Sequence, residues 1–132
     1  MRLKSHRIAV LVAEGVEDLE FYVPFMRLQE EGAEVVAAGL DTRPVRGKNG
    51  LKIQPTATIA SLEANDLLGV VIPGGWAPDK LRRHKAATEL VRDMAHATRI
   101  VARICQGGWV PISAVIVRGR RATRSIGPPA AN

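Results

Sequence analysis

The residue of this 132-residue chain best suited to covalent chemistry is its single cysteine, Cys105. It follows the apolar, β-branched run Ile100–Ile104, which has the length and composition of a buried strand. Gly107 and Gly108 follow it, before a segment predicted to be helical. A cysteine on a tight turn between a strand and a helix lies at the positive end of the helix dipole, where the thiolate form is favoured. The pattern predicts an exposed nucleophile. The alternative is a small, buried, apolar residue.

The elements that must position Cys105 alternate between apolar strands and helices. This alternation, without an internal repeat, indicates an α/β fold with a mainly parallel sheet. The first helix is expected to place Leu19, Val23 and Met26 against the sheet, and Pro24 to bend it or to lie in its first turn. We predict strands at Arg7–Val12, Glu34–Leu40, Leu51–Ile53, Gly69–Ile72 and Ile100–Ile104, and helices at Glu17–Glu31, Pro78–His84, Ala86–Ala97 and Gly108–Val117, with a short helical turn in Leu62–Leu68.

Three polar or glycine-rich segments come directly after predicted strands: Glu14–Glu20, Gly74–Trp76 and Cys105–Gly108. Chemistry in parallel sheets gathers at the carboxyl ends of the strands, so we expect these segments to meet. Backbone N–H groups after Pro73, together with that of Gln106, are suited to binding an oxyanion. An ordinary glycine-rich turn is the alternative. Two tryptophans, Trp76 and Trp109, are expected to wall the pocket or to pack at an interface.

Three motifs resemble those of the PfpI/DJ superfamily: Cys105–Trp109, Val16–Glu20 and Val71–Gly75. The resemblance covers the chain from about residue 7 to about residue 123. It implies a three-layer α/β sandwich, similar to class I glutamine amidotransferases and flavodoxins, with helices on both faces of a mainly parallel sheet. It also implies a single domain at residues 1–123, from which the family's C-terminal elements are missing, followed by a loose tail at residues 124–132.

The resemblance assigns Cys105 as the nucleophile and Glu20 as the carboxyl group that tunes the thiol. A carboxyl beside a thiolate is expected to stay protonated, because two adjacent negative charges repel each other. For Glu17 and Asp18, a role at the site and a role as acids that complement the helix dipole are equally good explanations. The predicted catalytic residues are Cys105, Glu20 and Gln106, and the predicted pocket residues are Gly74, Gly75, Trp76, Gly107 and Glu17.

Gln106 is the departure from the family pattern that matters most. Protease-like members have a histidine there, which can act as a base, whereas glutamine can form hydrogen bonds but cannot take up a proton. The chain's three histidines lie far from Cys105 in sequence, and no metal-ligand spacing occurs, so neither a metal nor a cofactor is predicted. Further departures are a charge in the strand at Arg103, a proline in the helix at Pro111, and Val115 where a helix-ending glycine is common.

The resemblance implies a cysteine-dependent hydrolase, either an intracellular peptidase or a cofactor-independent glyoxalase or deglycase acting on methylglyoxal adducts. Its expected substrate is a small carbonyl compound or a peptide, and its activity is expected to be weakened by Gln106. A non-enzymatic stress-response or redox-sensing module that uses an oxidisable Cys105 is the second hypothesis. A structural remnant without a functional site is the third.

Composition limits the environment and the partners of the chain. The formal charge of +6 arises after Asp93, where six arginines and no acidic residue follow thirteen acids balanced by thirteen lysines and arginines. No aromatic interleaving or nucleic-acid motif accompanies these arginines, so nucleic acid is not an expected partner. No apolar run reaches membrane-spanning length, and a single cysteine suits a reducing cytoplasm. Homo-oligomers are expected, because elements that normally cover the sheet are missing.

Overall fold

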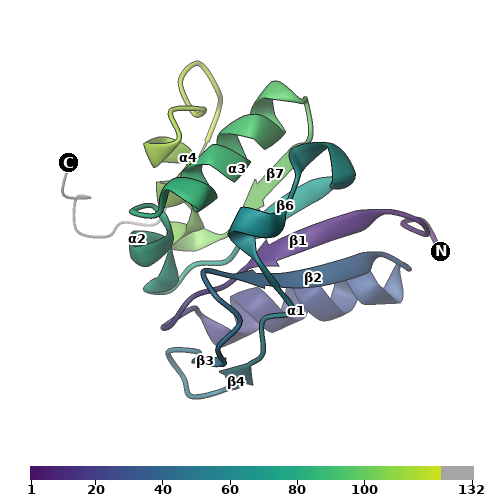
Figure 1. The fold of residues 1–132 in the computed structure, drawn as a ribbon, viewed down its shortest axis with the longest axis vertical. Coiled ribbons are helices and arrows are strands. Elements are labelled where there is room, and N and C mark those ends of the chain that lie inside the picture. Colours follow the sequence, from purple (N-terminus) through teal and green to yellow (C-terminus); the bar gives the residue numbers. More distant parts are fainter. Residues whose placement is uncertain (123–132) are drawn as a thin grey trace.

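The computed structural model describes residues 1–122, in which a five-stranded parallel sheet lies between helices on its two faces (Figure 1). The predicted start of the tail at residue 124 lies outside the described residues. The strand order is β5-β2-β1-β6-β7. The strands are β1 (Arg7–Leu11), β2 (Glu34–Gly39), β5 (Ala57–Thr58), β6 (Gly69–Ile72) and β7 (Ile100–Arg103).

The middle of the sheet is the hydrophobic core. Strand β1 pairs with β2 on one side and with β6 on the other, so that Ala9 lies beside both Val36 and Val70. All four residues of β6 are buried. Strands covered on both faces need continuous apolar sequence, which explains why these runs were recognisable in the sequence.

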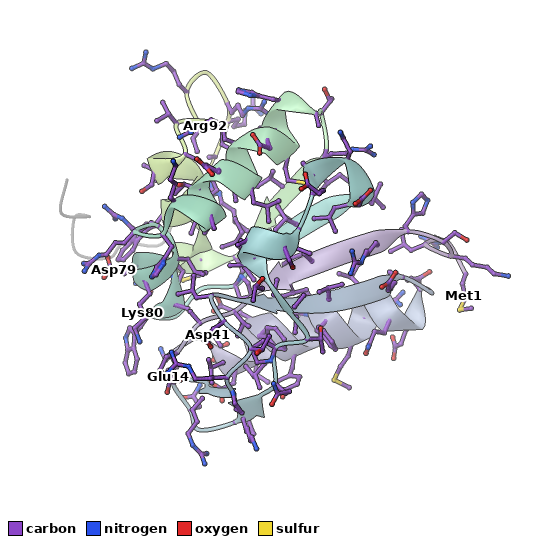
Figure 2. All side chains as sticks on the ribbon, in the orientation of Figure 1. Met1, Glu14, Asp41, Asp79, Lys80 and Arg92 are labelled. Atoms are coloured by element: carbon purple, nitrogen blue, oxygen red, sulfur yellow. The ribbon has the colours of Figure 1, made fainter. Side chains whose placement is uncertain are left out.

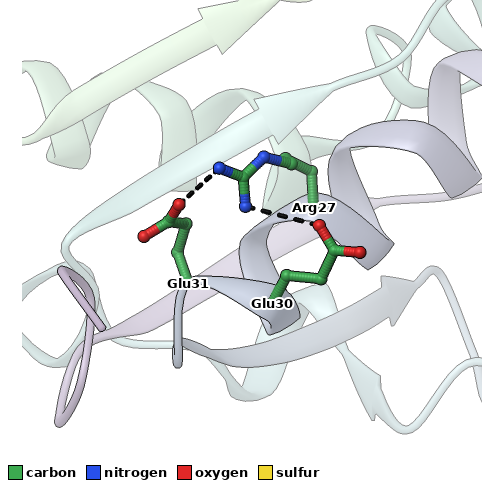
Figure 3. Close-up of polar contacts among 3 residues, drawn as sticks. All are labelled: Arg27, Glu30 and Glu31. Atoms are coloured by element: carbon green, nitrogen blue, oxygen red, sulfur yellow. Dashed lines mark hydrogen bonds and ion pairs between the residues drawn. The ribbon is translucent and has the colours of Figure 1, made fainter.

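Helix α1 (Asp18–Glu30) covers one face of the sheet and begins next to the predicted site. The side chain of Glu17 caps its first turn by accepting a hydrogen bond from the Glu20 N–H at 2.9 Å. Pro24 lies inside the helix. Near the C-terminal end, Arg27 pairs with Glu30 at 3.4 Å and with Glu31, which closes the last turn (Figure 3).

The predicted orientation of α1 is wrong. Leu19, Val23 and Met26 are 63%, 61% and 58% exposed, and we call them the apolar outer face of α1. The sheet is instead packed by Phe21, which is buried, and by Phe25, whose ring stacks on it with a centroid distance of 5.2 Å. Because aromatic side chains bury the larger area, their stripe outweighs the aliphatic one.

A small antiparallel hairpin, β3 (Val45–Arg46) and β4 (Lys52–Ile53), stands beside the start of α1. Its loop is held by the buried carboxylate of Asp18, which accepts hydrogen bonds from the N–H groups of Asn49 and Leu51, both at 2.9 Å. Burial alone would raise the pKa of Asp18, but these backbone hydrogen bonds bring it below its ordinary value. Asp18 is therefore a loop anchor rather than only an acid at a helix start.

The second helical layer consists of α2 (Ala77–Leu81), α3 (Lys85–His96) and α4 (Trp109–Ser113). Helix α3 buries Leu90, Val91 and Met94, which share one helical face. One-turn 3₁₀ helices lie at Ile59–Ser61, just before the predicted helical turn, and at Ala64–Asp66, within it.

Strand β7 departs from its predicted place in the middle of the sheet. It pairs with β6, and no other strand in residues 1–122 pairs with its far side. Ile100 is consequently 57% exposed, and Arg103 is half-buried rather than enclosed. The charge of Arg103 is tolerated because it lies at an edge. Helix α4 is also shorter than predicted, ending at Ser113 rather than at Val117.

Candidate active site around Cys105

Cys105 lies on a strained turn between β7 and α4. Its φ is +52°, a conformation that costs a non-glycine residue on the order of 1–3 kcal/mol. Cys105 opens the 3₁₀ turn Cys105–Gly108 and is exposed. Gly107 is buried against β6, where a Cβ would lie 2.0 Å from the Ile72 carbonyl oxygen. The geometry is a tight turn between a strand and a helix that presents an exposed cysteine.

Glu20 and Cys105 both lie next to Gly74. The Gly74 N–H donates a hydrogen bond to Glu20 Oε1 at 2.9 Å. A Cβ on Gly74 would lie 2.4 Å from that oxygen and 3.2 Å from the Cys105 Cβ. The absence of a side chain at position 74 therefore leaves space in which the carboxyl and the cysteine can approach each other.

The environment of Glu20 favours its protonated form. Burial is the largest influence and raises the pKa of Glu20, and the charge of Glu17 raises it further. The Gly74 hydrogen bond and the charge of Lys48 act in the opposite direction, but the pKa remains above the ordinary value. A carboxyl in this state can donate a proton or a hydrogen bond.

The loop after β6 is fixed to the segment before α1 by a short antiparallel bridge. The Glu17 N–H donates to the Gly74 carbonyl at 3.1 Å, and the Trp76 N–H donates to the Gly15 carbonyl at 2.9 Å. Gly75, between them, has φ +80°. Within residues 1–122, the backbone N–H groups of Gly75 and Gln106 have no intramolecular acceptor, whereas that of Gly74 is used by Glu20.

The remaining predicted site residues differ in what they contact. Glu17 caps α1 and also accepts a hydrogen bond from Asn49 Nδ2 at 3.0 Å, so its contacts are those of a positioning residue. Trp76 is exposed, packs over Gly15 and lies under the Lys48 ammonium, 5.7 Å from its ring centroid. Trp109 is half-buried, with the Arg82 guanidinium 5.7 Å from its ring centroid.

Gln106 is half-buried, and its side-chain amide has no hydrogen-bond partner among the described residues. His6, His84 and His96 are all exposed. No group of three or more histidine, cysteine or acidic residues within residues 1–122 is arranged to hold a metal ion. In the same part of the chain, no helix has the length and apolar character needed to cross a bilayer.

Two cavities lie away from Cys105. One, of about 570 Å³, runs along the outer side of β7 and is lined by the arginines at 99, 103, 120 and 121. The other, of about 350 Å³, lies at the carboxyl ends of β1 and β2, where Figure 2 shows Glu14, Asp41 and Lys80 close together. Lys80 Nζ donates to the Glu14 carbonyl there at 3.2 Å. Cys105 lines neither cavity.

Sequence reasoning missed two residues near the site. The sequence leaves Asp18 open between a role at the site and a role as a helix-dipole acid, and does not predict that it anchors the neighbouring loop. Lys48 lies in the polar stretch around the Asn49-Gly50 turn, and no local pattern indicates that this loop returns to the site. Long-range hydrogen bonds to Asp18 and to the Val16 carbonyl bring it there.

Comparison with known proteins gives a consistent result. The model of the DJ-1/PfpI family matches residues 6–128. An uncharacterized protein of Archaeoglobus fulgidus is 40% identical over 121 residues, which are 92% of this chain and 72% of that protein. The protein named deglycase PfpI of Pyrococcus furiosus is 36% identical over 92% of this chain and 73% of its own length.

Solved structures agree with this family. A two-domain protein of Anabaena variabilis, with DJ-1/ThiJ/PfpI-like and ferritin-like domains, superimposes with a TM-score of 0.90 at 36% identity, covering 92% of this chain and 35% of that one. Oxidized DJ-1 of Toxoplasma gondii gives a TM-score of 0.83 at 26% identity over 90% of this chain and 66% of its own. The fold class and the resemblance predicted from the sequence motifs are confirmed, and the chain belongs to the DJ-1/PfpI family.

Proposed function

We propose that this chain is a cysteine-dependent enzyme of the hydrolase or deglycase type, acting on a small carbonyl compound or a peptide, with Cys105 as nucleophile. The observation that carries the proposal is the arrangement around Gly74, where a half-buried carboxyl with a raised pKa and an exposed cysteine on a strained turn both border the space that a side chain at position 74 would occupy. Relatives named as deglycases, among them the Pyrococcus protein and protein/nucleic acid deglycase 2 of Escherichia coli, support the same chemistry.

In the first chemical step, the Cys105 thiolate adds to the substrate carbonyl carbon. A C–S bond forms, and the electron pair of the C=O double bond moves to oxygen. The free N–H groups of Gly75 and Gln106 are suited to stabilise that oxyanion. Protonated Glu20 then transfers its proton to the oxyanion, which leaves a neutral adduct and a Glu20 carboxylate.

Later steps also need a base. The Glu20 carboxylate left by the first step is one, but position 106, where a histidine would supply a second, holds a glutamine. A glyoxalase must move a proton between two carbon atoms, and a deglycase or peptidase must activate water for release of the product. The Gln106 amide cannot accept that proton. A positioned base contributes about 10²–10⁴-fold, so we expect the adduct to form readily and to turn over slowly.

The second candidate function is a redox or stress module in which Cys105 is oxidised reversibly. The exposure of the thiol favours it, because oxidation to a sulfenic acid needs solvent access. A structural relative is described as oxidized DJ-1, and another relative as general stress protein 18. Under this hypothesis a glutamine at position 106 does not impair function, because reversible oxidation of Cys105 needs no base there.

Intact-mass spectrometry distinguishes these functions. The protein and its Cys105→Ser variant are treated with methylglyoxal or with mild peroxide, and methylglyoxal consumption is followed in parallel. A Cys105-dependent adduct with slow consumption supports the enzyme. A reversible oxygen addition without any methylglyoxal adduct supports the redox module. If Cys105 reacts with neither reagent, both proposals fail and the structural remnant is left.

We also propose that the protein self-associates, in a cytoplasmic setting, through the apolar outer face of α1. Leu19, Val23 and Met26 form a continuous exposed stripe there. Light scattering over a dilution series tests this. A monomer at every concentration, or an oligomer that persists after Val23→Glu, contradicts it.

A further inference from the structure

We propose that Lys48 and Trp76 form an anion-binding subsite beside Cys105 that favours substrates carrying a carboxylate or a phosphate near the reacting carbonyl. That the bound anion is a substrate rests on the proposed function. The existence of the subsite rests on the geometry of the β3–β4 loop. We call this pair of residues the Lys48–Trp76 subsite.

The subsite is continuous with the active-site loop. Trp76 directly follows Gly74 and Gly75, and its N–H is fixed to the Gly15 carbonyl. Lys48 Nζ lies over its ring, 5.7 Å from the centroid. Because Gly74 contacts both Glu20 and the Cys105 Cβ, the ammonium stands at one side of the same loop that borders the nucleophile.

The backbone beneath Lys48 is held from several sides. Its own N–H donates to the Val16 carbonyl at 2.9 Å. The Asp18 carboxylate, which is 2% exposed, accepts hydrogen bonds from the N–H groups on either side of Gly50, those of Asn49 and Leu51. Gly47 packs against the Asp18 carboxylate so closely that a Cβ would lie 2.2 Å from it. Such anchoring limits the positions that the exposed ammonium can sample.

The charge of Lys48 is not neutralised by an ion pair with any acidic residue in residues 1–122. The acids closest to it are committed elsewhere: Asp18 to the loop backbone, Glu17 to the helix cap and Asn49, and Glu20 to Gly74. The charge of Lys48 contributes to the lowered pKa of Asp18 and opposes the raised pKa of Glu20, in keeping with a position close to both carboxyl groups. An anchored, unpaired cation near a nucleophile attracts anionic reactants.

The alternative is that Lys48 only packs on an exposed tryptophan, a contact that requires no ligand. The two possibilities differ in their effect on Cys105. A cation that acts on reactants accelerates an anionic reagent more than a neutral one of the same size, whereas a packing residue does not distinguish them.

Alkylation of Cys105 tests this difference without any enzymatic activity, and the single cysteine makes the reading unambiguous. The rates with iodoacetate, an anion, and with iodoacetamide, its neutral analogue, are compared at low ionic strength. We expect Lys48→Gln to lower the iodoacetate-to-iodoacetamide ratio by about 3- to 10-fold, and 0.5 M salt to remove most of that difference. Lys48→Arg should keep the ratio.

The matched control is Lys52→Gln, which removes the same charge from β4 of the same hairpin. It should leave the ratio unchanged. The proposal is overturned if Lys48→Gln retains the wild-type ratio, or if Lys52→Gln lowers it equally, since the effect is then one of net charge. Protection of Cys105 from iodoacetamide by acetate or by inorganic phosphate, lost in Lys48→Gln, identifies which anion the subsite prefers.

A second arm connects the subsite to the proposed function. Glyoxylate carries a carboxylate beside its aldehyde, whereas methylglyoxal is neutral. We expect Lys48→Gln to raise the KM for glyoxylate several-fold and to leave that for methylglyoxal unchanged. If the protein consumes neither compound, the proposed function fails while the alkylation ratio still decides on the subsite. Equal changes for both substrates contradict the subsite itself.

Discussion

The two halves of the candidate site differ in how firmly the surrounding strands and helices hold them. Glu20 lies on α1, and Gly74 and Gly75 lie in the loop that follows β6, a strand buried along its whole length. Cys105 and Gln106 follow β7, whose outer side is unpaired within residues 1–122, and precede a helix of five residues. The proposed proton partner and the proposed anion-binding loop are therefore fixed more firmly than the proposed nucleophile. Catalytic efficiency will depend on how well the weaker half holds Cys105.

Backbone strain separates the halves as well. Of the non-glycine residues at positive φ in residues 1–122, Cys105 and Val115 both belong to the β7–α4 half, with φ of +52° and +60°. In the β1–β6 half the left-handed positions next to the site, Gly15 and Gly75, are glycines. A left-handed glycine is unstrained, whereas a β-branched residue there is an outlier.

The most damaging change we predict is at the contact between the halves. Gly107→Ala should lower the free energy of unfolding by about 3 kcal/mol, because its Cβ would meet the Ile72 carbonyl oxygen of β6 at 2.0 Å. Gly108→Ala is the control, since its Cβ would meet only the movable end of Arg103, and it should cost less than about 1 kcal/mol. Urea denaturation measures both, and equal losses would show that the elbow is not pressed against β6.

Gln106→His tests whether the less firmly held β7–α4 half positions Cys105 well enough for an added base to act on it. If Cys105 is well positioned, the new imidazole should raise methylglyoxal consumption on the order of 10²-fold. If the open edge at β7 lets the elbow drift, the rate should not change, because a displacement of about 1 Å can cost that same factor. Cys105→Ser in both backgrounds controls for uncatalysed loss. Fast Cys105-dependent turnover by the unmodified protein would show that Gln106 does not limit it.

Asp18→Asn tests the firmer half. The amide cannot accept from both Asn49 and Leu51 as the carboxylate does, so we expect a loss of about 2 kcal/mol at pH 7. The pKa of Asp18 is lowered on folding, so its stabilisation is fully present above the ordinary aspartate pKa of about 4 and is lost as pH falls below it. Urea midpoints for both proteins should therefore begin to converge as the pH falls below about 4.

The exposed Asp66 offers a control for Asp18→Asn, since Asp66→Asn should change neither the stability nor its pH dependence. A difference that persists unchanged at pH 3 would mean that the carboxylate charge is not what holds the loop.

The firmer half was also the more predictable from sequence. The predicted strand Gly69–Ile72 matches β6 residue for residue, because a strand buried on both faces is apolar throughout. Predictions failed for features that depend on which elements pack beside a segment. Along α1, Leu19-Val23-Met26 and Phe21-Phe25-Leu28 share one spacing, so periodicity alone could not choose the inward stripe. The edge position of β7 and the short strand β5 depend equally on what lies beside them.

The candidate site divides in the same way. Cys105, Glu20 and Gly74 were identifiable because each follows or faces a strand end in a recognisable motif. Lys48 and the anchoring role of Asp18 were not, because they depend on hydrogen bonds between residues about thirty positions apart. Local propensity contains no information on such pairs.

The smallest effect we predict is a gain in the weaker half. Val115 follows α4 in the position where the Ile116 N–H bonds to the Pro111 carbonyl and its own N–H to the Ile112 carbonyl, a helix end that favours glycine. Val115 is 69% exposed, so its side chain contributes little burial. Relief of the left-handed strain outweighs the added freedom of the unfolded chain, and Val115→Gly should raise stability by about 1 kcal/mol. Val117→Gly, at negative φ nearby, should lower it. A Val115→Gly protein no more stable than its parent would mean that the weakness of this half lies in the open edge of β7 and not in its backbone strain.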